Sequence, residues 1–196
     1  MKIFTTIELL RAMNKKGYAV FNNGNPFNLN IVGVRANNPS PDNFDDTIYC
    51  FYSNYGWIKF AWPVTTDPGL FYLQNPLNVD GTAILAPGQY RGAFKIGLHH
   101  GQYEALVQAK PVRVIRDTNR DNKLDFGSEN IVEGMFGINI HRASIKHESI
   151  QVDKWSAGCQ VFANPDHFKT FIELCKNSKE LYGNRFTYTL LNEKDI

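Results

Sequence analysis

Short runs of β-branched and aromatic residues, separated by turn residues, are the feature that most limits how this chain can fold. Such runs are typical of β-strands, and the Asn, Gly and Pro residues between them are typical of turns. The runs occupy residues 18–21, 31–35, 47–52, 57–62, 65–73, 81–90, 94–108, 111–115 and 185–191. The chain is therefore predicted to be mainly β.

Two segments with helical spacing interrupt this pattern. Thr5 and Glu8 have the spacing of a capping box, and apolar residues then recur at helical intervals until Gly17. The second segment begins at Pro165, which is at a favoured first position of a helix, and it ends at Gly183. We expect a mainly β protein with α, in which a short N-terminal helix and a C-terminal helix flank the strands.

Length and charge favour one globular domain, spanning residues 1–196. A chain of 196 residues can bury a sizeable core without disulfides or metals. Its net charge of +2, with no block of Lys or Arg, argues against a nucleic-acid partner. The N-terminal residues lack the apolar core and cleavage site of a signal peptide, and no stretch is long enough to span a membrane.

The three cysteines divide into two predicted core residues and one predicted nucleophile. Cys50 lies in a strand pattern and Cys175 on the apolar face of the C-terminal helix. Cys159 instead follows Ser156 and Gly158, and His141 precedes it by eighteen residues at the end of an apolar run. An imidazole can take the proton of a thiol and so make it a nucleophile. The alternative is that Cys159 is a small buried hydrophobe and His141 a hydrogen-bonded core histidine.

The stretch from Gly137 to Phe168 resembles the catalytic motif of the L,D-transpeptidase catalytic domain family. That motif places a His at a strand end, then Ser or Thr, His, Gly and Cys, and usually an Asn and an Asp beyond the Cys. The residues at matching positions are His141, Ser156, Gly158, Cys159, Asn164 and Asp166. The chain departs from the motif at Ala157, where the family has His, and at Val161, where the family commonly has Arg.

The resemblance implies a β-sandwich-like domain and a cysteine acyl-transfer enzyme that acts on peptidoglycan stem peptides. Cys159 would be the nucleophile that forms a thioester, and His141 would be its general base. Ser156 and the backbone N–H groups at Gly158 and Cys159 would stabilise the oxyanion. This chemistry requires no metal or organic cofactor.

Several functions remain open under this resemblance. The acyl acceptor is an amine in a transpeptidase and water in an L,D-carboxypeptidase. A lysin-type or delivered cysteine peptidase on the same fold is an alternative, and so is an inactive cell-wall binding or structural module. The expected site of action is the cell wall or periplasm. Without a signal peptide in the sequence, the protein would be made in the cytoplasm and exported or released by another route.

Four residues near the motif are predicted to bind substrate. Arg142 follows the general base, and its guanidinium could bind the carboxylate of a stem peptide if the strand ends at His141. The alternative is a surface Arg paired with an acidic neighbour. Ala157 and Gln160 flank the cysteine within the motif. One of the adjacent residues His99 and His100 could supply the imidazole that is missing at residue 157, and His100 is the one we predict at the site, although a turn histidine is the more common explanation.

An Asp-rich loop follows the run 111–115 and is a candidate for a structural calcium ion. Its Asp117, Asn119, Asp121 and Asp125 lie at the first, third, fifth and ninth positions of a calcium-loop pattern. The twelfth position, which should be Glu, is Ser128. An EF-hand is therefore not expected. The alternative to a bound calcium is a polar hairpin whose side chains bind their own backbone.

Overall fold

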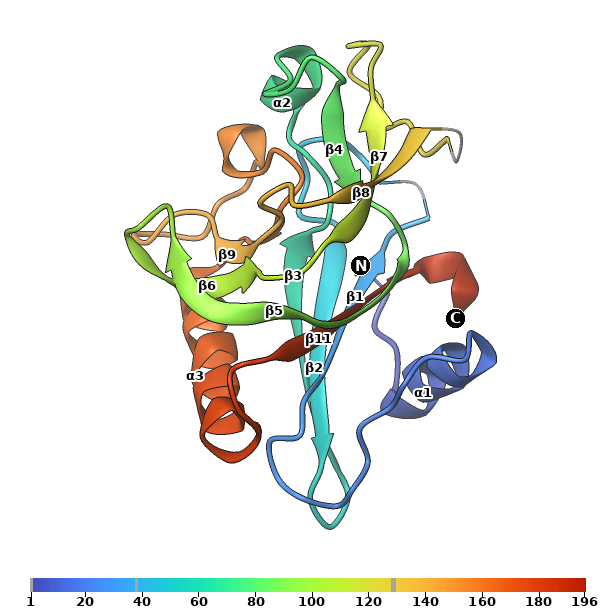
Figure 1. Cartoon of the computed structure of the whole chain (residues 1–196), viewed down its shortest axis with the longest axis vertical. Coiled ribbons are helices and arrows are strands. Elements are labelled where there is room, and N and C mark those ends of the chain that lie inside the picture. The colour runs from blue at the N-terminus through green and yellow to red at the C-terminus, as the bar shows by residue number, and fades with distance from the viewer. Residues whose placement is uncertain (1, 38, 128–129) are drawn as a thin grey trace.

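The computed structural model describes residues 2–37, 39–127 and 130–196. Within this part of the chain there are eleven β-strands and three α-helices (Figure 1). The strands are β1 (Asn30–Arg35), β2 (Asp46–Ser53), β3 (Trp57–Thr65), β4 (Thr82–Leu85), β5 (Gly88–His99), β6 (Tyr103–Gln108), β7 (Val112–Asp117), β8 (Ile131–Gly134), β9 (Ile140–Arg142), β10 (Gln160–Phe162) and β11 (Phe186–Asn192). The helices are α1 (Thr6–Lys15), α2 (Leu70–Gln74) and α3 (Pro165–Tyr182), with 3-10 turns at η2 (Asp153–Trp155) and η3 (Glu193–Asp195).

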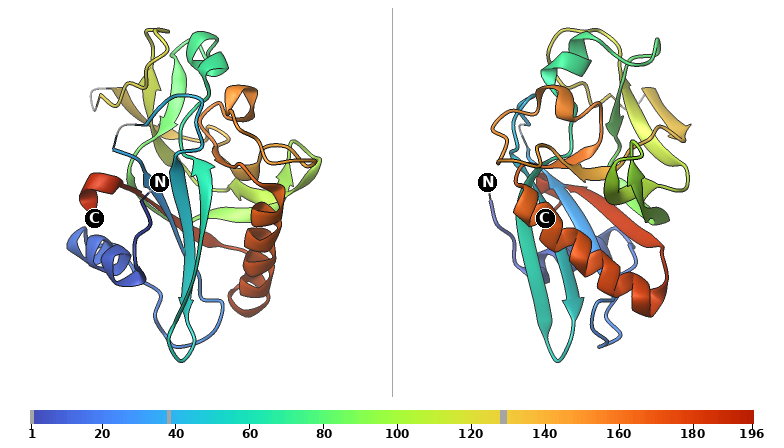
Figure 2. Two further views of the ribbon diagram at one scale, coloured as in Figure 1. Left: turned by 180° about the vertical axis from the view of Figure 1, so that it is seen from behind. Right: turned by 90° about the vertical axis from the view of Figure 1, so that its left-hand side faces the viewer.

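Eight strands form a closed barrel in the order β1-β11-β5-β6-β9-β10-β3-β2. Neighbouring strands are antiparallel except for the pairs β1/β11 and β9/β10, which are parallel. The other three strands form a separate sheet in the order β4-β7-β8, which lies at one end of the barrel (Figures 1 and 2). The prediction of a mainly β protein with α is confirmed. The main sheet closes more completely than the two open sheets of a β-sandwich.

Side chains alternate along β2, so this one strand contributes residues to two apolar clusters. Ile48 and Cys50 belong to the large core cluster, whereas Tyr49 and Phe51 belong to a second cluster with residues of α1. Successive residues of a strand point to opposite faces, so both faces of β2 are apolar and both are covered. Figures 1 and 2 show α1 and α3 on opposite sides of the β2–β3 hairpin.

Both predicted terminal helices form where their capping signals lie. The Thr5 side chain accepts a hydrogen bond from the Glu8 backbone, and the Glu8 side chain accepts one from the Thr5 backbone. At α3, Asn164 caps the first turn and Gly183 lies at the C-cap. The apolar face of α3 includes Cys175, which is fully buried in the same cluster as Cys50. Both cysteines are therefore core residues, as predicted.

Two predicted strands are wrong. Residues 18–21 are not a strand, because side-chain amides bind their backbone instead: Gln89 binds both the N–H and the C=O of Ala19, and Asn30 binds Phe21 in the same way. Residues 65–73 contain α2. That helix begins after Gly69, where a Cβ would lie 2.0 Å from the Asp153 carbonyl oxygen, so the close approach of these two backbones requires glycine.

The described helices include none that is long and apolar enough to span a bilayer.

Candidate active site

The pairing of β9 with β10 brings His141 and Cys159 to the same side of the barrel wall. In this parallel pair Val161 lies opposite His141, and Gln160 lies opposite Ile140. Cys159 immediately precedes β10 and shares the face of Val161, because side chains two residues apart point the same way. Both His141 and Cys159 line one cavity of about 590 Å³. Residues of β4 and β7 also line it, so the cavity lies between the barrel and the three-stranded sheet.

The sulfur of Cys159 lies between two backbone groups. The Asn139 N–H donates to Sγ at 3.4 Å, and the thiol donates to the Gly137 carbonyl oxygen at 3.5 Å. Burial raises the pKa of the Cys159 thiol to about 11, and the Asn139 N–H partly offsets this effect. Cys159 is therefore a neutral thiol at pH 7, with a donor in place to stabilise the thiolate when it forms.

His141 is oriented by the carbonyl group of the next residue. Its Nδ1 lies 2.8 Å from the Arg142 carbonyl oxygen, which can only accept, so Nδ1 carries the proton and Nε2 is free to take one. The Tyr103 hydroxyl lies 3.4 Å from Nδ1 and donates to the same carbonyl. Burial, and then the neighbouring His99, lowers the pKa of His141 to about 3. The imidazole is neutral at pH 7, as a general base must be.

His99 lies in the site together with the predicted His100. Its ring stacks on that of His141, with centroids 4.0 Å apart and planes 18° apart. The Asn139 side-chain amide lies 3.1 Å from His99 Nδ1, and burial lowers the pKa of His99 to about 4. His99 shares its strand face with the exposed Lys95, so alternation along β5 gives no sign that it is buried. Its ring packs against those of His100, Tyr103 and His141.

Ser156 and Gly158 build the turn that carries Cys159. The buried Ser156 hydroxyl donates to the Cys159 carbonyl oxygen at 2.9 Å and accepts from the Gly158 N–H at 3.2 Å. Gly158 has φ of +119°, and a Cβ there would lie 2.1 Å from the Ala83 carbonyl oxygen. These two residues position the cysteine, and they are not free to bind an oxyanion as predicted.

The Cys159 N–H is the remaining candidate oxyanion donor. Among the residues that the structure describes, no acceptor binds it. It therefore stays available to a substrate oxygen next to the sulfur, in the way that backbone donors stabilise tetrahedral intermediates.

The four predicted substrate-binding residues separate into two pairs. Ala157 and the exposed His100 line the cavity. Gln160 does not, because its side chain is fully buried between the Tyr188 hydroxyl, at 2.8 Å, and the Gly158 carbonyl oxygen, at 3.3 Å. The prediction that β9 ends at His141 is also wrong, since β9 continues through Arg142. The Arg142 guanidinium lies over the Tyr103 ring, 3.9 Å from its centroid, and does not line the cavity.

Two cations that the sequence analysis did not single out line the cavity. Arg116 of β7 lies over the ring of Phe136 and donates to the Gly81 carbonyl oxygen at 3.0 Å. Lys154 of η2 lies over the ring of Phe71, 4.4 Å from its centroid. Among the described residues that line the cavity, none is Asp or Glu. The cavity therefore favours a ligand with a negatively charged group.

The Asp117 loop is held mainly by its own side chains. The Asn119 amide donates to Asp125 at 2.7 Å, the Asp121 N–H donates to Asn119 at 3.2 Å, and the Asp125 N–H donates to Asp117 at 3.1 Å. No group of three His, Cys, Asp or Glu residues that could hold a metal ion occurs within the described ranges. One oxygen of Asp117 is nevertheless buried without a hydrogen-bond partner. Ser128 lies outside the described residues, and the calcium site stays a prediction.

No protein-family model, curated protein or solved structure matches this chain.

Proposed function

We propose that this protein is a cysteine-dependent acyl-transfer enzyme of the L,D-transpeptidase type, acting on peptidoglycan stem peptides. The observation that carries the proposal is that Cys159 and His141 line one cavity, with His141 on β9 and Cys159 directly before the paired strand β10. The resemblance of residues 137–168 to the family motif supports the choice of chemistry. On this proposal, the barrel and its three-stranded sheet together correspond to the β-sandwich-like domain of that family.

The reaction begins with a neutral thiol and a neutral imidazole. His141 Nε2 takes the proton of Cys159 as Sγ attacks the amide carbonyl carbon, and the carbonyl oxygen becomes an oxyanion next to the Cys159 N–H. The C–N bond then breaks, and the imidazolium gives its proton to the leaving amine. A thioester remains. An acceptor amine or water then attacks it, His141 takes the acceptor's proton, and the proton returns to the sulfur as the thiolate leaves.

The charge of the cavity supports a substrate with a free carboxylate. Arg116 and Lys154 line the cavity, and neither forms an ion pair with another residue in the described part of the chain. A stem peptide carries a carboxylate that either cation could bind. This role was predicted for Arg142, and we now assign it to Arg116 and Lys154.

Hydrolysis is the second candidate outcome of the same chemistry. Ala157 lines the cavity and lacks the imidazole that the family motif places there. A site with a smaller side chain at this position leaves room for water as the acceptor, as an L,D-carboxypeptidase or a lysin-type peptidase requires. In each case the expected place of action is the cell wall or periplasm.

Mass spectrometry of muropeptides incubated with the protein tests the proposal. We expect a transpeptidase to give new cross-links and a carboxypeptidase to give stem peptides without their terminal residue. Cys159→Ala should abolish both products, while Cys175→Ala, which removes a buried thiol away from the cavity, should retain them. Unchanged muropeptides with folded wild-type protein would favour an inactive cell-wall module, and products from Cys159→Ala would exclude Cys159 as the nucleophile.

A further inference from the structure

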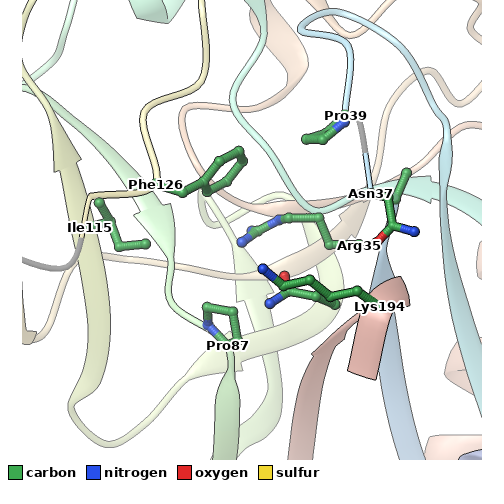
Figure 3. A pocket seen from close by; sticks show the side chains of 9 residues that line it. Arg35, Asn37, Pro39, Pro87, Ile115, Phe126 and Lys194 are labelled. Carbon is green, nitrogen blue, oxygen red and sulfur yellow. The ribbon is translucent and has the colours of Figure 1, made fainter. Parts of the chain in front are cut away.

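A second cavity, of about 210 Å³, lies apart from the thiol, where β1, the β11–η3 junction and the loop after β7 meet (Figure 3). Its walls are mainly apolar and include Pro39, Pro87, Ile115 and Phe126. Figure 3 shows the side chains of Arg35 and Lys194 pointing into the space between Phe126 and Pro87. None of these residues takes part in the proposed acyl transfer.

Arg35 is buried and only partly satisfied. Its side chain is 2% exposed, and its Nε lies 2.8 Å from Asp67 and 3.0 Å from the Thr66 hydroxyl. Nη2 donates to the carbonyl oxygens of Thr66 and Leu85 at 3.0 and 3.1 Å. Nη1 is buried and has no hydrogen-bond partner. Leaving a buried guanidinium nitrogen without a hydrogen-bond acceptor is energetically unfavourable. The residues of the protein do not supply this acceptor, so a ligand in the cavity could.

The charges around the cavity define the missing partner further. Asp67 balances Arg35 as an ion pair. Burial, and then the adjacent Asp67, raises the pKa of the nearby Asp46 to about 7, so Asp46 is largely protonated below that pH. Lys194 adds a positive charge at the cavity, and no described Asp or Glu lines it. A negatively charged group is therefore the complement of this cavity.

We propose that this cavity binds a small organic monocarboxylate. One carboxylate oxygen would accept from Arg35 Nη1 and the other from Lys194, as charge-assisted hydrogen bonds. The apolar part of the ligand would pack against Phe126 and the two prolines. Phe126 is 40% exposed and lies over the Arg35 guanidinium, with the ring centroid 5.1 Å from Cζ. Its ring is therefore placed to contact a ligand bound at Arg35. Inorganic phosphate has no apolar part that could pack against these walls.

Benzoate, benzyl alcohol and inorganic phosphate at matched ionic strength are suitable probes. Isothermal titration calorimetry on the intact chain at pH 6.5 measures binding, and the melting temperature provides a second readout. We expect benzoate to bind and to raise the melting temperature. Benzyl alcohol, which has the same ring without the charge, should not bind measurably. Phosphate should bind more weakly than benzoate.

Substitutions at the exposed rim test the geometry while keeping the buried Arg35 itself. Lys194→Met and Phe126→Ala should each weaken benzoate binding roughly tenfold. The first removes a charge-assisted hydrogen bond to the carboxylate, and the second removes apolar packing against the ring. Lys179→Met, which removes an exposed lysine from the distant helix α3, should leave the affinity unchanged. The absence of benzoate binding, equal affinity in Lys194→Met and wild type, or stronger binding of phosphate would each overturn the proposal. Benzoate should leave muropeptide products unaltered, so this result is independent of the proposed function.

Discussion

Cys159 and His141 are both held neutral by the same physical cause. Burial raises the pKa of the thiol to about 11 and lowers that of the imidazole to about 3. A resting thiolate–imidazolium pair is therefore not expected, although nucleophilic cysteines are often activated in that way. In this site the proton is transferred during attack, which is general base catalysis.

The first prediction concerns the pH dependence of thiol alkylation. The reactive form, neutral imidazole with neutral thiol, predominates between the pKa of His141 and that of Cys159. We expect the rate of iodoacetamide alkylation at Cys159 to be nearly constant from roughly pH 5 to pH 9. In His141→Ala the rate should instead rise about tenfold per pH unit, because only the thiolate fraction then reacts.

Peptide mass spectrometry identifies the alkylated cysteine. The labelling that remains in the Cys159→Ala variant gives the contribution of Cys50 and Cys175. A wild-type rate that follows the His141→Ala profile would show that His141 does not assist the thiol.

The sequence could identify the two proposed reactive residues but not their neighbours. Cys159 and His141 lie in a local pattern of small residues and strand ends that is visible in one stretch. His99, Arg116 and Lys154 come from β5, β7 and η2, and only the tertiary fold brings them to the same cavity. A tertiary contact of this kind leaves no local signal.

For helices and strands, the sequence predictions are correct where the backbone groups find their hydrogen-bond partners within the element or its caps. Helix α1 follows its capping box, and α3 follows its cap and its Pro at the first position. They failed where distant side chains bind the backbone, as at residues 18–21. They also failed for β9, which is only three residues long and pairs with β6 at a single position, Leu106 with Ile140. Its extent depends on its neighbours more than on its own residues.

The second prediction concerns the Asp117 loop between β7 and β8. Asp117 is 2% exposed and has one buried oxygen without a partner, and burial raises the pKa of its carboxyl group. A calcium ion would supply that partner, with the Asn119–Asp125 contact rearranging to turn its oxygens inward. We expect saturating calcium to raise the melting temperature of the wild type and EDTA to lower it, through linkage of binding to folding. Asp121→Ala, at an exposed loop position, should abolish both changes.

Magnesium at the same concentration is the control for ionic strength. A melting temperature that does not respond to calcium or EDTA would leave the polar hairpin as the explanation of this loop.

In the molecule as a whole, the two cysteines of the apolar core lie apart from the cavity that holds Cys159. Cys50 and Cys175 are fully buried in the main apolar cluster and do not line the cavity. Burial raises the pKa of both thiols, so neither competes with Cys159 as a nucleophile.

The third prediction follows from this separation. Cys50→Ser should lower the free energy of unfolding by about 1–3 kcal/mol, because its hydroxyl would be buried among apolar side chains. Urea denaturation measures this loss. Muropeptide turnover by the folded fraction should stay at the wild-type level. A parallel loss of turnover per folded molecule would mean that the core and the cavity are coupled.

The order of strands around the barrel also bears on how the protein is made. Strand β11 lies between β1 and β5, so residues 30–35 pair with residues 186–192. A ribosome releases these two segments far apart in time, and such distant pairing makes folding slow. The ring of strands cannot close until residue 192 has emerged. A nascent chain that stops before residue 186 would therefore carry both proposed reactive residues in an open sheet, and we expect acyl transfer only after β11 has closed the barrel.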